Sequence, residues 1–424
     1  MPKNISYSLP KDSKAWQQAV DSVVELLPDD IDLHDFDALQ SLPLFAVIVV
    51  LPAQVSALDI HQYIQSWVNE QPNWHLVTVA EDTQANYVDI SVDSSADTPN
   101  PAYANTNGAN VQDSPNKSSV ANSALPPIVT AQVFRYLLVP VSDTLMHPAK
   151  KTAAAHMIDE QLTSRLRHDL AAHYQRQSAT SGDTAMATAF DNADLVDCHI
   201  LSVGHMLRTH KLACFDMDST LIEQEVIVEL AKTVGVGMQV EAITEAAMRG
   251  EIDFDDSFAQ RLALLKGVPT HVLDEICARL TLSTGARTTI SALKTLGYHT
   301  ILVSGGFTYF AHYIAEQLGI DEVHANNLDI DENEVSGHIQ LPIINGEKKA
   351  AIVAHTAERL GIAMSQVVCV GDGANDLPMM AIADLGVAYR AKSIVQARAD
   401  AAVNVTGLEG VLYALGYPAL VANA

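Results

Sequence analysis

The sequence predicts an α/β protein with a parallel sheet, preceded by an α+β region at its N-terminus. After Lys211, short apolar strands alternate with helical stretches, and the strands end in a polar residue or a glycine. The three clearest cases are Leu212–Phe215 before Asp216, Thr300–Val303 before Ser304, and Val367–Val370 before Gly371. Strands separated by helices form parallel sheets, and ligands of such sheets bind beyond the carboxyl ends of the strands. We therefore expect a binding site where these strand ends meet.

The composition narrows the class of protein. The chain has 424 residues, of which 48% are hydrophobic, so about two to three domains with sizeable cores are expected. Its 25 Lys and Arg against 51 Asp and Glu give a net charge of −26. This charge argues against nucleic-acid binding and against docking on anionic lipid. The longest strongly apolar run, Leu44–Leu51, is far shorter than the roughly 20 residues of a membrane helix.

Two further features favour a cytoplasmic location. The first residues lack the apolar stretch of a secretory signal. The four cysteines form no CxxC motif, so reduced thiols are expected rather than a disulfide framework. The 16 histidines show no HExxH pattern, which argues against a zinc site.

The N-terminal region, residues 1–200, has weaker patterns. Strands are expected at Leu44–Leu51, His75–Val79 and Ile128–Val139, and helices at Ala57–Asn69 and Ile158–Tyr174. Residues 91–127 are rich in Ser, Asn, Asp, Ala and Pro and carry almost no large apolar side chains. Such a segment cannot bury enough surface to offset its chain entropy, so a disordered insert is predicted there.

The first strand end of the C-terminal half carries two aspartates, Asp216 and Asp218, in the run DMDST. A carboxylate at the tip of a buried strand can bind a divalent cation or attack phosphorus as a nucleophile. A second carboxylate two residues on points the same way along extended backbone and can act as a general acid and base. By itself, the run is explained equally well by a helix N-cap.

The other strand ends favour the chemical interpretation. The run GDGAND places Asp372, Asn375 and Asp376 in a glycine-rich turn, where an ordinary Asx-turn would explain only one of them. Ser304 and Gly305 offer a hydroxyl and unhindered backbone N–H groups to an anion. Lys349 is a candidate to clamp a phosphate, although a solvated surface lysine is the alternative and Lys348 competes for the role.

These four motifs in this order resemble the haloacid dehalogenase superfamily, over residues 208–418 of the chain. The resemblance implies a HAD-like Rossmannoid parallel sheet at residues 208–424 with a small helical cap at residues 226–287. For the α+β region before the sheet, an ACT-like regulatory fold, which this family sometimes carries there, and a divergent, non-binding appendage are equally compatible with the sequence. GDGxND is shared with P-type ATPases. Those pumps carry DKTGT at the nucleophile and need membrane helices, and the sequence shows neither feature. Asp218 favours phosphoryl transfer, because dehalogenases lack the second acid.

Carried over to this chain, the resemblance implies a role for each motif residue. Asp216 is the expected nucleophile and Asp218 the general acid and base. Mg²⁺ is the expected cofactor, held by the Asp216 carboxylate, the Asp218 backbone carbonyl and Asp372. The phosphate is expected to bind Ser304, Gly305, Lys349 and Asn375, with Asp376 supporting the metal ligands.

The expected cap determines the substrate. The helix that begins near Phe254 places Arg261 on its apolar side, where the cation either snorkels to solvent or binds a carboxylate. The family pattern assigns Arg261 to the substrate carboxylate and Glu225 to its ammonium group. Phe254 is a candidate to line the pocket, but packing in the core of the cap is favoured. The implied reaction is hydrolysis of O-phospho-L-serine, the last step of serine biosynthesis.

Other interpretations stay open at this level. A phosphotransferase that passes the phosphoryl group to another alcohol, such as homoserine, would carry the same motifs. The N-terminal region could instead make the chain an amino-acid-sensing regulatory protein. A small phosphomonoester is the expected partner, and a homodimer is compatible with the sequence. Residues 329–333 resemble the start of a calcium loop, but Glu334 and Gln340 break that pattern and an exposed hairpin is favoured.

Overall fold

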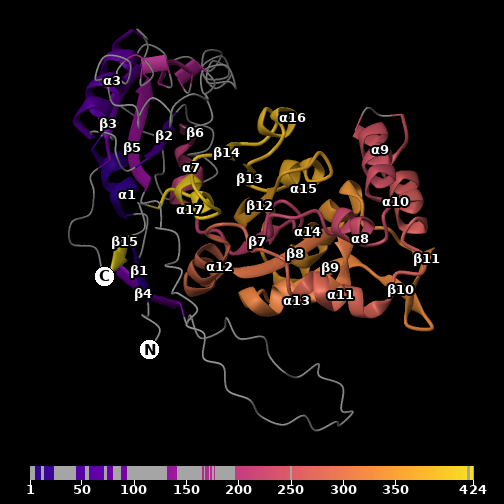
Figure 1. Cartoon of the computed structure of the whole chain (residues 1–424). Helices are drawn as coiled ribbons and strands as arrows, with labels where there is room; N and C mark the ends of the chain where they lie inside the picture. Colours follow the sequence, from indigo (N-terminus) through magenta and orange to yellow (C-terminus); the bar gives the residue numbers. More distant parts are fainter. Residues whose placement is uncertain are drawn as a thin grey trace, which may run out of the picture.

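The computed structural model describes residues 5–10, 14–22, 44–52, 57–70, 74–79, 87–92, 131–140, 165–166, 168–170, 172–173, 176, 196–248, 251–417 and 421–423. Within these ranges the strands form sheets of six, four, three and two strands. Figure 1 shows the four-stranded sheet and the cap helices at opposite ends of the six-stranded sheet.

The six-stranded sheet is parallel throughout, as the sequence predicts. Its order is β14-β13-β12-β7-β8-β9, with strands β7 (Leu212–Phe215), β8 (His299–Phe307), β9 (Glu322–Asn326), β12 (Val367–Gly371), β13 (Leu385–Tyr389) and β14 (Ala401–Val403). Alternate residues of β7 enter different apolar clusters: Ala213 and Phe215 one, Leu212 and Cys214 the other. Burial on both faces explains why these strands are continuously apolar.

Helices cover both faces of this sheet. Helices α12 (Ala286–Thr295) and α13 (Thr308–Leu318) contribute to the first cluster, whereas α14 (Gly346–Leu360) and α15 (Leu377–Ile382) contribute to the second. This three-layer arrangement leaves the carboxyl ends of the strands as the open edge where a ligand can approach.

The cap consists of four helices inserted between β7 and α12. They are α8 (Val226–Thr233), α9 (Gly237–Met248), α10 (Phe254–Ala263) and α11 (Thr270–Cys277). The expected cap extended to residue 287, but its last helix ends at Cys277 and Ala286 already begins α12.

A hairpin of β10 (Leu328–Asp331) and β11 (Glu334–Ile339) packs against the cap. Its turn residues Glu332 and Asn333 both have positive φ, 47° and 66°, which is the geometry of a tight hairpin turn. The favoured hairpin is therefore confirmed at the segment that resembles a calcium loop.

The N-terminal region is α+β, as expected. Its elements run β2 (Phe45–Pro52), α3 (Ala57–Asn69), β3 (Trp74–Thr78), β5 (Ala131–Pro140), helical residues between 165 and 173, and β6 (Asp197–Ser202). The antiparallel order β3-β5-β2-β6 is that of the split β-α-β, or ferredoxin-like, arrangement. An ACT-like regulatory role for this region stays a prediction.

The predicted disordered insert is wrong at its first residues. Residues 91 and 92 belong to β4 (Tyr87–Val92), which joins β1 (Ile5–Pro10) and β15 (Val421–Asn423) in the three-stranded sheet. This strand was not predicted from the sequence because its partner in the sheet, β1, lies far away in the sequence. Residues 93–127 of the insert lie outside the described residues.

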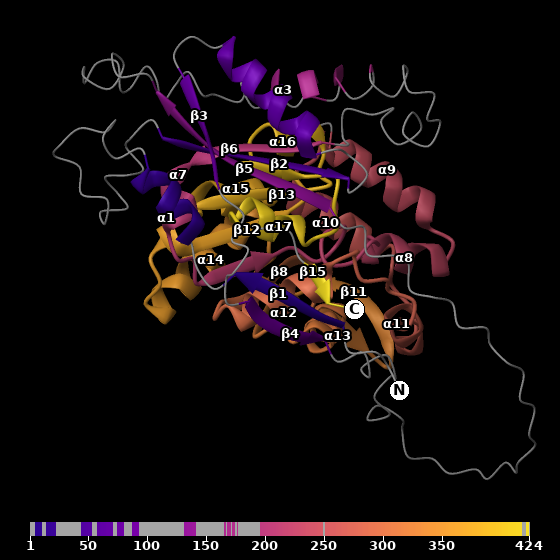
Figure 2. The same cartoon turned by 90° about the vertical axis from the view of Figure 1, so that its left-hand side faces the viewer.

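The N-terminal sheet is packed directly against the C-terminal half (Figure 2). Alternate residues of β2 face different clusters: Val47 and Val49 pack with α3, while Ala46 and Ile48 join the cluster that contains Phe215. This explains the continuously apolar run in β2. A short helix, α7 (Val203–Leu207), connects β6 to the C-terminal half, and the predicted division near residue 200 stays a prediction.

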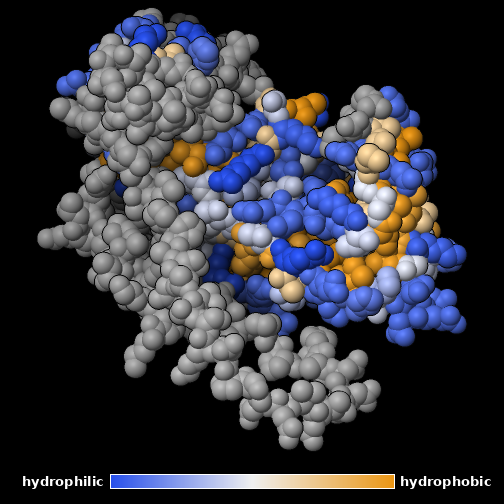
Figure 3. Space-filling view, viewed as in Figure 1, coloured by the Kyte–Doolittle hydropathy of each residue, from blue (hydrophilic) through white to orange (hydrophobic). Residues whose placement is uncertain are grey.

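The surface and the cysteines follow simple patterns. In the parts of the chain described above, no helix combines the length and the apolar character that crossing a bilayer requires. All four cysteines are buried and free, as expected for reduced thiols. On the face shown in Figure 3, hydrophilic residues predominate over the six-stranded sheet, and apolar residues show beside the cap helices.

Candidate active site

Three neighbouring strands, β12, β7 and β8, deliver the predicted motifs to one place. Phe215 pairs with Val370 on one side and with Leu302 on the other, so Asp216 lies at the level of Gly371 and Val303, one residue before Asp372 and Ser304. The backbone N–H of Asp216 donates to the carbonyl of Val370 over 3.0 Å. The strand ends open into a pocket of about 440 Å³.

All ten predicted site residues meet at this pocket. Eight of them line it: Asp216, Asp218, Glu225, Arg261, Ser304, Gly305, Asp372 and Asn375. The other two, Lys349 and Asp376, lie beneath it and are fully buried. Residues from separate strands and from the cap thus converge at the carboxyl edge of the sheet, where the sequence predicts the site.

Lys349 is the buried lysine, whereas its neighbour Lys348 is exposed. The ammonium of Lys349 donates to Oδ1 of Asp216 and to Oδ1 of Asp376, both over 2.7 Å. Burial by itself would lower the pKa of Lys349, but the two carboxylates raise it above its usual value. The side chain is therefore a fixed positive charge under the pocket, and the surface-lysine alternative is wrong.

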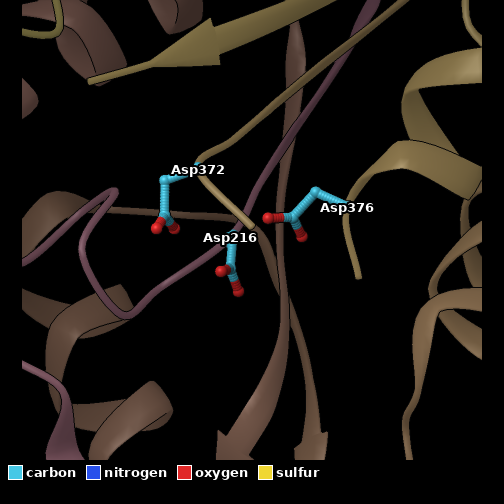
Figure 4. Close-up of side chains that lie close together, drawn as sticks. All are labelled: Asp216, Asp372 and Asp376. Carbon is cyan, nitrogen blue, oxygen red and sulfur yellow. The ribbon is translucent and has the colours of Figure 1, made fainter. Parts of the chain in front are cut away.

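Three carboxylates cluster around this charge. One oxygen each from Asp216, Asp372 and Asp376 lies within 4.8 Å of the others, and Figure 4 shows the groups close together. Burial, with the neighbouring carboxylates adding to it, raises the pKa of Asp216 to about 7 and that of Asp372 to about 8. Like charges crowded in this way favour a cation between them.

The donor set suits a hard divalent cation. Both oxygens of Asp376 are engaged, by Lys349 and by the N–H of Gly373 at 2.9 Å, which leaves Asp216 and Asp372 facing the pocket. Carboxylate and carbonyl oxygens are the ligands that Mg²⁺ prefers. A Cβ at Gly371 would lie 2.4 Å from Asp376, so only glycine lets this carboxylate approach the strand end.

Asp218 lies beside the beginning of helix α8. Its Oδ1 accepts a long hydrogen bond, 3.4 Å, from the N–H of Val226. Burial raises the pKa of Asp218 well above its usual value, and the nearby charges of Glu225 and Asp216 raise it further. A carboxyl group that holds its proton near neutral pH can serve as a general acid.

The cap contributes a charge of each sign. Glu225 accepts from the Ser219 hydroxyl over 2.9 Å, and Ser219 holds a left-handed φ of 57°. Arg261 donates from Nε to the Ser257 carbonyl at 3.3 Å. Burial lowers the pKa of Arg261, while Glu225 and Asp218 oppose that shift. The two side chains line the same pocket as the strand ends.

Phe254 has both of the roles that the sequence left open. It packs against the large apolar cluster but is only partly buried, and it also lines the pocket. Its ring lies so close to Gly305 that a Cβ there would meet it at 3.2 Å. Phe254 is the first residue of α10, and the first turn of a helix that enters from a loop can face a cavity while the later turns pack inside.

Three residues at the site were not expected. Thr220 donates to Oδ1 of Asp372 at 3.4 Å, Lys392 lines the pocket, and Asn326 bridges two of its loops. Asn326 ends a strand, so the strand-end rule could have found it. The strand Glu322–Asn326 is short and largely polar, so it lacks the apolar pattern by which a buried strand is predicted.

The comparisons with known proteins agree with this geometry. A family model described as haloacid dehalogenase-like hydrolase matches residues 210–384. A phosphoserine phosphatase from Polaromonas sp. is 46% identical over 212 residues, which cover 49% of this chain and 90% of that protein. The chain belongs to the haloacid dehalogenase-like hydrolases.

Other similarities define how far this family relationship extends. A phosphoserine phosphatase from Archaeoglobus fulgidus is 44% identical over 212 residues, but the match covers only 62% of that protein. A crystal structure of a HAD family hydrolase from Salmonella enterica serovar Typhi has a TM-score of 0.59 at 25% identity. That match covers 87% of this chain and 98% of the other, so it extends beyond the family-model region into the N-terminal part.

Proposed function

We propose that the chain hydrolyses O-phospho-L-serine to L-serine and phosphate, with Mg²⁺, through an aspartyl-phosphate on Asp216. The observation that carries the proposal is one pocket that joins the buried Asp216 and the half-buried Asp218 at a strand end to Glu225 and Arg261 beside the cap. The similarity to curated phosphoserine phosphatases supports the part of the proposal that concerns hydrolysis of a phosphate monoester. The corresponding metabolic role is the last step of serine biosynthesis.

In the first half-reaction, the Asp216 carboxylate attacks phosphorus and the bond from phosphorus to the serine oxygen breaks. The ion pair with Lys349 favours the ionised form of Asp216 and engages Oδ1, so Oδ2 is the free nucleophilic oxygen. Asp218 donates its proton to the departing serine oxygen. Its raised pKa supports this role, since the group must start protonated.

In the second half-reaction, a water molecule attacks the phosphorus of the aspartyl-phosphate. Asp218, now ionised, accepts a proton from that water as the bond between Asp216 and phosphorus breaks. The products are inorganic phosphate and free Asp216, and Asp218 has regained its proton. One carboxyl group thus serves both halves of the cycle, as acid and then as base.

The charge that develops on the phosphoryl oxygens needs fixed positive groups. Ser304, Gly305 and Asn375 are proposed to donate hydrogen bonds to these oxygens, with Lys349 beneath them. A Mg²⁺ held by Asp216, Asp372 and the Asp218 backbone carbonyl would add positive charge on the same side. Preorganised electrostatic stabilisation of this kind usually contributes more to catalysis than any other single effect.

The cap pair is proposed to select an amino-acid ester. Arg261 offers a planar cation to the substrate carboxylate, and Glu225 offers an anion to its ammonium group. Both side chains line the same pocket as the nucleophile. A phosphate ester that lacks either group would leave one of these charges without a partner.

A phosphate-release assay tests the proposal. Purified protein is incubated with a panel of small phosphomonoesters, with Mg²⁺ and with EDTA, and inorganic phosphate is measured. We expect phosphoserine to be hydrolysed best and only with Mg²⁺. Parallel reactions with added homoserine detect transfer instead of hydrolysis, because transfer yields a new phosphate ester. Absence of phosphate release from every ester would refute the proposed function.

A further inference from the structure

The strand that carries Ser304 departs from its neighbour at the pocket. Strand β8 pairs with β9 at Val303 with His324, and then only again at Phe307 with Asn326. Three residues of β8, Ser304 to Gly306, therefore stand opposite a single residue of β9. Bulges next to active sites redirect side chains, at the cost of lost ladder hydrogen bonds.

Asn326 replaces what the bulge loses. It ends β9 and is only 3% exposed. Its Nδ2 donates to the carbonyl of Gly305 over 2.8 Å, and its Oδ1 accepts from the N–H of Ile344 over 2.7 Å. A carbonyl on one side and an N–H on the other permit only one orientation of the side-chain amide. Both ends of the group are thus used, each on a different loop of the pocket.

The hydrogen bond to Gly305 reaches Ser304 through one peptide unit. In a planar trans peptide, the carbonyl of Gly305 and the N–H of Gly306 point in opposite directions. With its carbonyl held by Asn326, this peptide directs the Gly306 N–H to Oγ of Ser304 over 2.8 Å. Because that oxygen accepts a hydrogen bond, the hydroxyl hydrogen of Ser304 is free to be donated into the pocket.

The second hydrogen bond fixes the opposite loop. Ile344 lies directly before Asn345, which caps helix α14 by accepting from the N–H of Lys348 at 3.1 Å. The same helix carries Lys349 in its first turn. The Ile344 carbonyl also lies against Gly305, since a Cβ there would meet it at 3.4 Å. Asn326 therefore joins the loop of Ser304 to the loop that leads to Lys349.

We propose that Asn326 is a positioning residue of the phosphate site, which orients the Ser304 hydroxyl through the Gly305–Gly306 peptide and sets its separation from the Lys349 helix. The inference rests on the proposed phosphatase function, because it assumes that Ser304 donates to the substrate phosphate. Asn326 itself acts through these neighbours and does not line the pocket.

The test uses one matched pair of variants in the full chain. Asn326→Asp keeps an acceptor for Ile344 but loses the donor to Gly305. Asn327→Asp adds the same charge one residue away, at an exposed side chain. Misplacement of a catalytic contact can cost on the order of 10²-fold, so kcat/KM for phosphoserine is expected to fall about that much in the first variant and less than about threefold in the second.

A double-mutant cycle separates positioning from general damage. If Asn326 acts through the Ser304 hydroxyl, Asn326→Asp should cost less than about threefold once Ser304→Ala has removed that hydroxyl. Multiplicative losses, or equal activity of Asn326→Asp and Asn327→Asp, would overturn the inference. Should Asn326→Asp fail to fold in thermal unfolding, Asn326→Ser is the milder variant, because the space it leaves lets water reach both loops.

Measuring phosphate binding tests the role of Asn326 independently of the proposed function. Calorimetric titration with inorganic phosphate in the presence of Mg²⁺ requires no turnover, and the same four proteins of the cycle are compared. We expect about tenfold weaker binding in Asn326→Asp, an effect that Ser304→Ala largely abolishes. If the unmodified chain releases no phosphate from any ester, the proposed function fails, and these titrations still decide the role of Asn326.

Discussion

Lys349 shows how the site balances its charges at the scale of single residues. A fully buried ammonium group is costly unless it is paired and hydrogen-bonded. Asp216 and Asp376 provide both, each at 2.7 Å. The same pairing serves the proposed chemistry, because it favours an ionised nucleophile in a place where burial raises the pKa of Asp216 to about 7.

Replacing Asp216 with asparagine should abolish turnover. An amide oxygen is not a nucleophile toward phosphorus, so kcat is expected to fall by at least about 10⁴-fold, as when a nucleophile is removed from other enzymes. Phosphate release in a preparation free of other phosphatases measures it. Asp331→Asn makes the same change at an exposed position of the hairpin and is expected to leave kcat unchanged. Substantial remaining activity in Asp216→Asn would refute the nucleophile assignment.

Arg261→Ala should impair phosphoserine selectively. A lost hydrogen bond to a charged group costs about 1.5–3 kcal/mol, which corresponds to about 10- to 200-fold in kcat/KM. Phosphoethanolamine lacks the carboxylate, and its kcat/KM should change by less than about threefold. Arg279→Ala, at an exposed arginine of the neighbouring helical segment, is the matched control. Equal losses on both esters would count against carboxylate recognition.

Metal binding should strengthen as pH rises. Without a bound metal ion, the pKa values of Asp216 and Asp372 are raised to about 7 and about 8, so both carboxyl groups are largely protonated at pH 6. A cation binds the ionised forms and must displace these protons. Apparent Mg²⁺ affinity should therefore increase between pH 6 and 9, with proton release at neutral pH. Calorimetry in buffers of different ionisation enthalpy measures this release, and its absence would contradict the prediction.

At the scale of elements, the β10–β11 hairpin is a brace for the cap. Backbone hydrogen bonds run from Gly267 to Val335 and from Val335 to Val268, both 2.8 Å, and from Thr270 to Asn333 at 2.9 Å. They join the segment between α10 and α11 to the hairpin. Helix α10 carries both Phe254 and Arg261, so the brace helps to set where these side chains enter the pocket.

Gly337→Ala should loosen this brace. Gly337 has a φ of 76°, and a Cβ there would lie 3.0 Å from Lys266 and 3.5 Å from the backbone of Ala263. We expect the free energy of unfolding to fall by about 2 kcal/mol, because the alanine is strained and displaces α10. The KM for phosphoserine should rise, because α10 carries side chains of the pocket. Gly297→Ala has similar strain, φ 86°, but no neighbour within 4 Å, and should cost about 1 kcal/mol with unchanged KM. Equal effects of the two variants would refute the brace.

At the scale of the whole molecule, the N-terminal sheet and the six-stranded sheet share one apolar cluster and a polar junction. The buried Asp197 carboxylate, at the start of β6, accepts from the N–H groups of Asn404 and Val405 at 2.9–3.0 Å. On the other side, Trp16 Nε1 donates to the Gly416 carbonyl at 3.0 Å. These contacts attach the N-terminal region far from the cap (Figure 1).

Asp197→Ala should destabilise the whole chain. It removes the acceptor of two part-buried backbone N–H groups, at a cost of up to about 1–3 kcal/mol each before relaxation. We expect the urea midpoint to fall, with kcat/KM for phosphoserine within about twofold, because the junction is remote from the pocket. Asp197→Asn keeps one acceptor oxygen and should lose less. An unchanged midpoint in Asp197→Ala would show that the junction does not couple the two sheets.

Much of the site could be predicted because its motifs are local. The runs DMDST and GDGAND each keep their carboxylates together because the residues are adjacent in the chain. In a parallel sheet, the carboxyl ends of neighbouring strands lie side by side, so the two runs meet. Asn326 also stands at a strand end, but its role as the link between two loops depends on a bulge in β8 that no local pattern encodes. The strands β1, β4 and β15 were missed because each pairs with a strand that is distant in sequence, and the pairing of β1 with β15 spans nearly the entire chain.

The amino-acid sequence by itself determined the parallel sheet, the order of its motifs and the chemical type of each site residue, because apolar periodicity and short motifs are properties of neighbouring residues. Only the tertiary structure decided which lysine is buried, that Phe254 faces the pocket, and that Asn326 connects Ser304 to the Lys349 helix. Burial and hydrogen bonding depend on residues that are distant in sequence. Their physical effects, on pKa and on side-chain orientation, arise when the chain has folded.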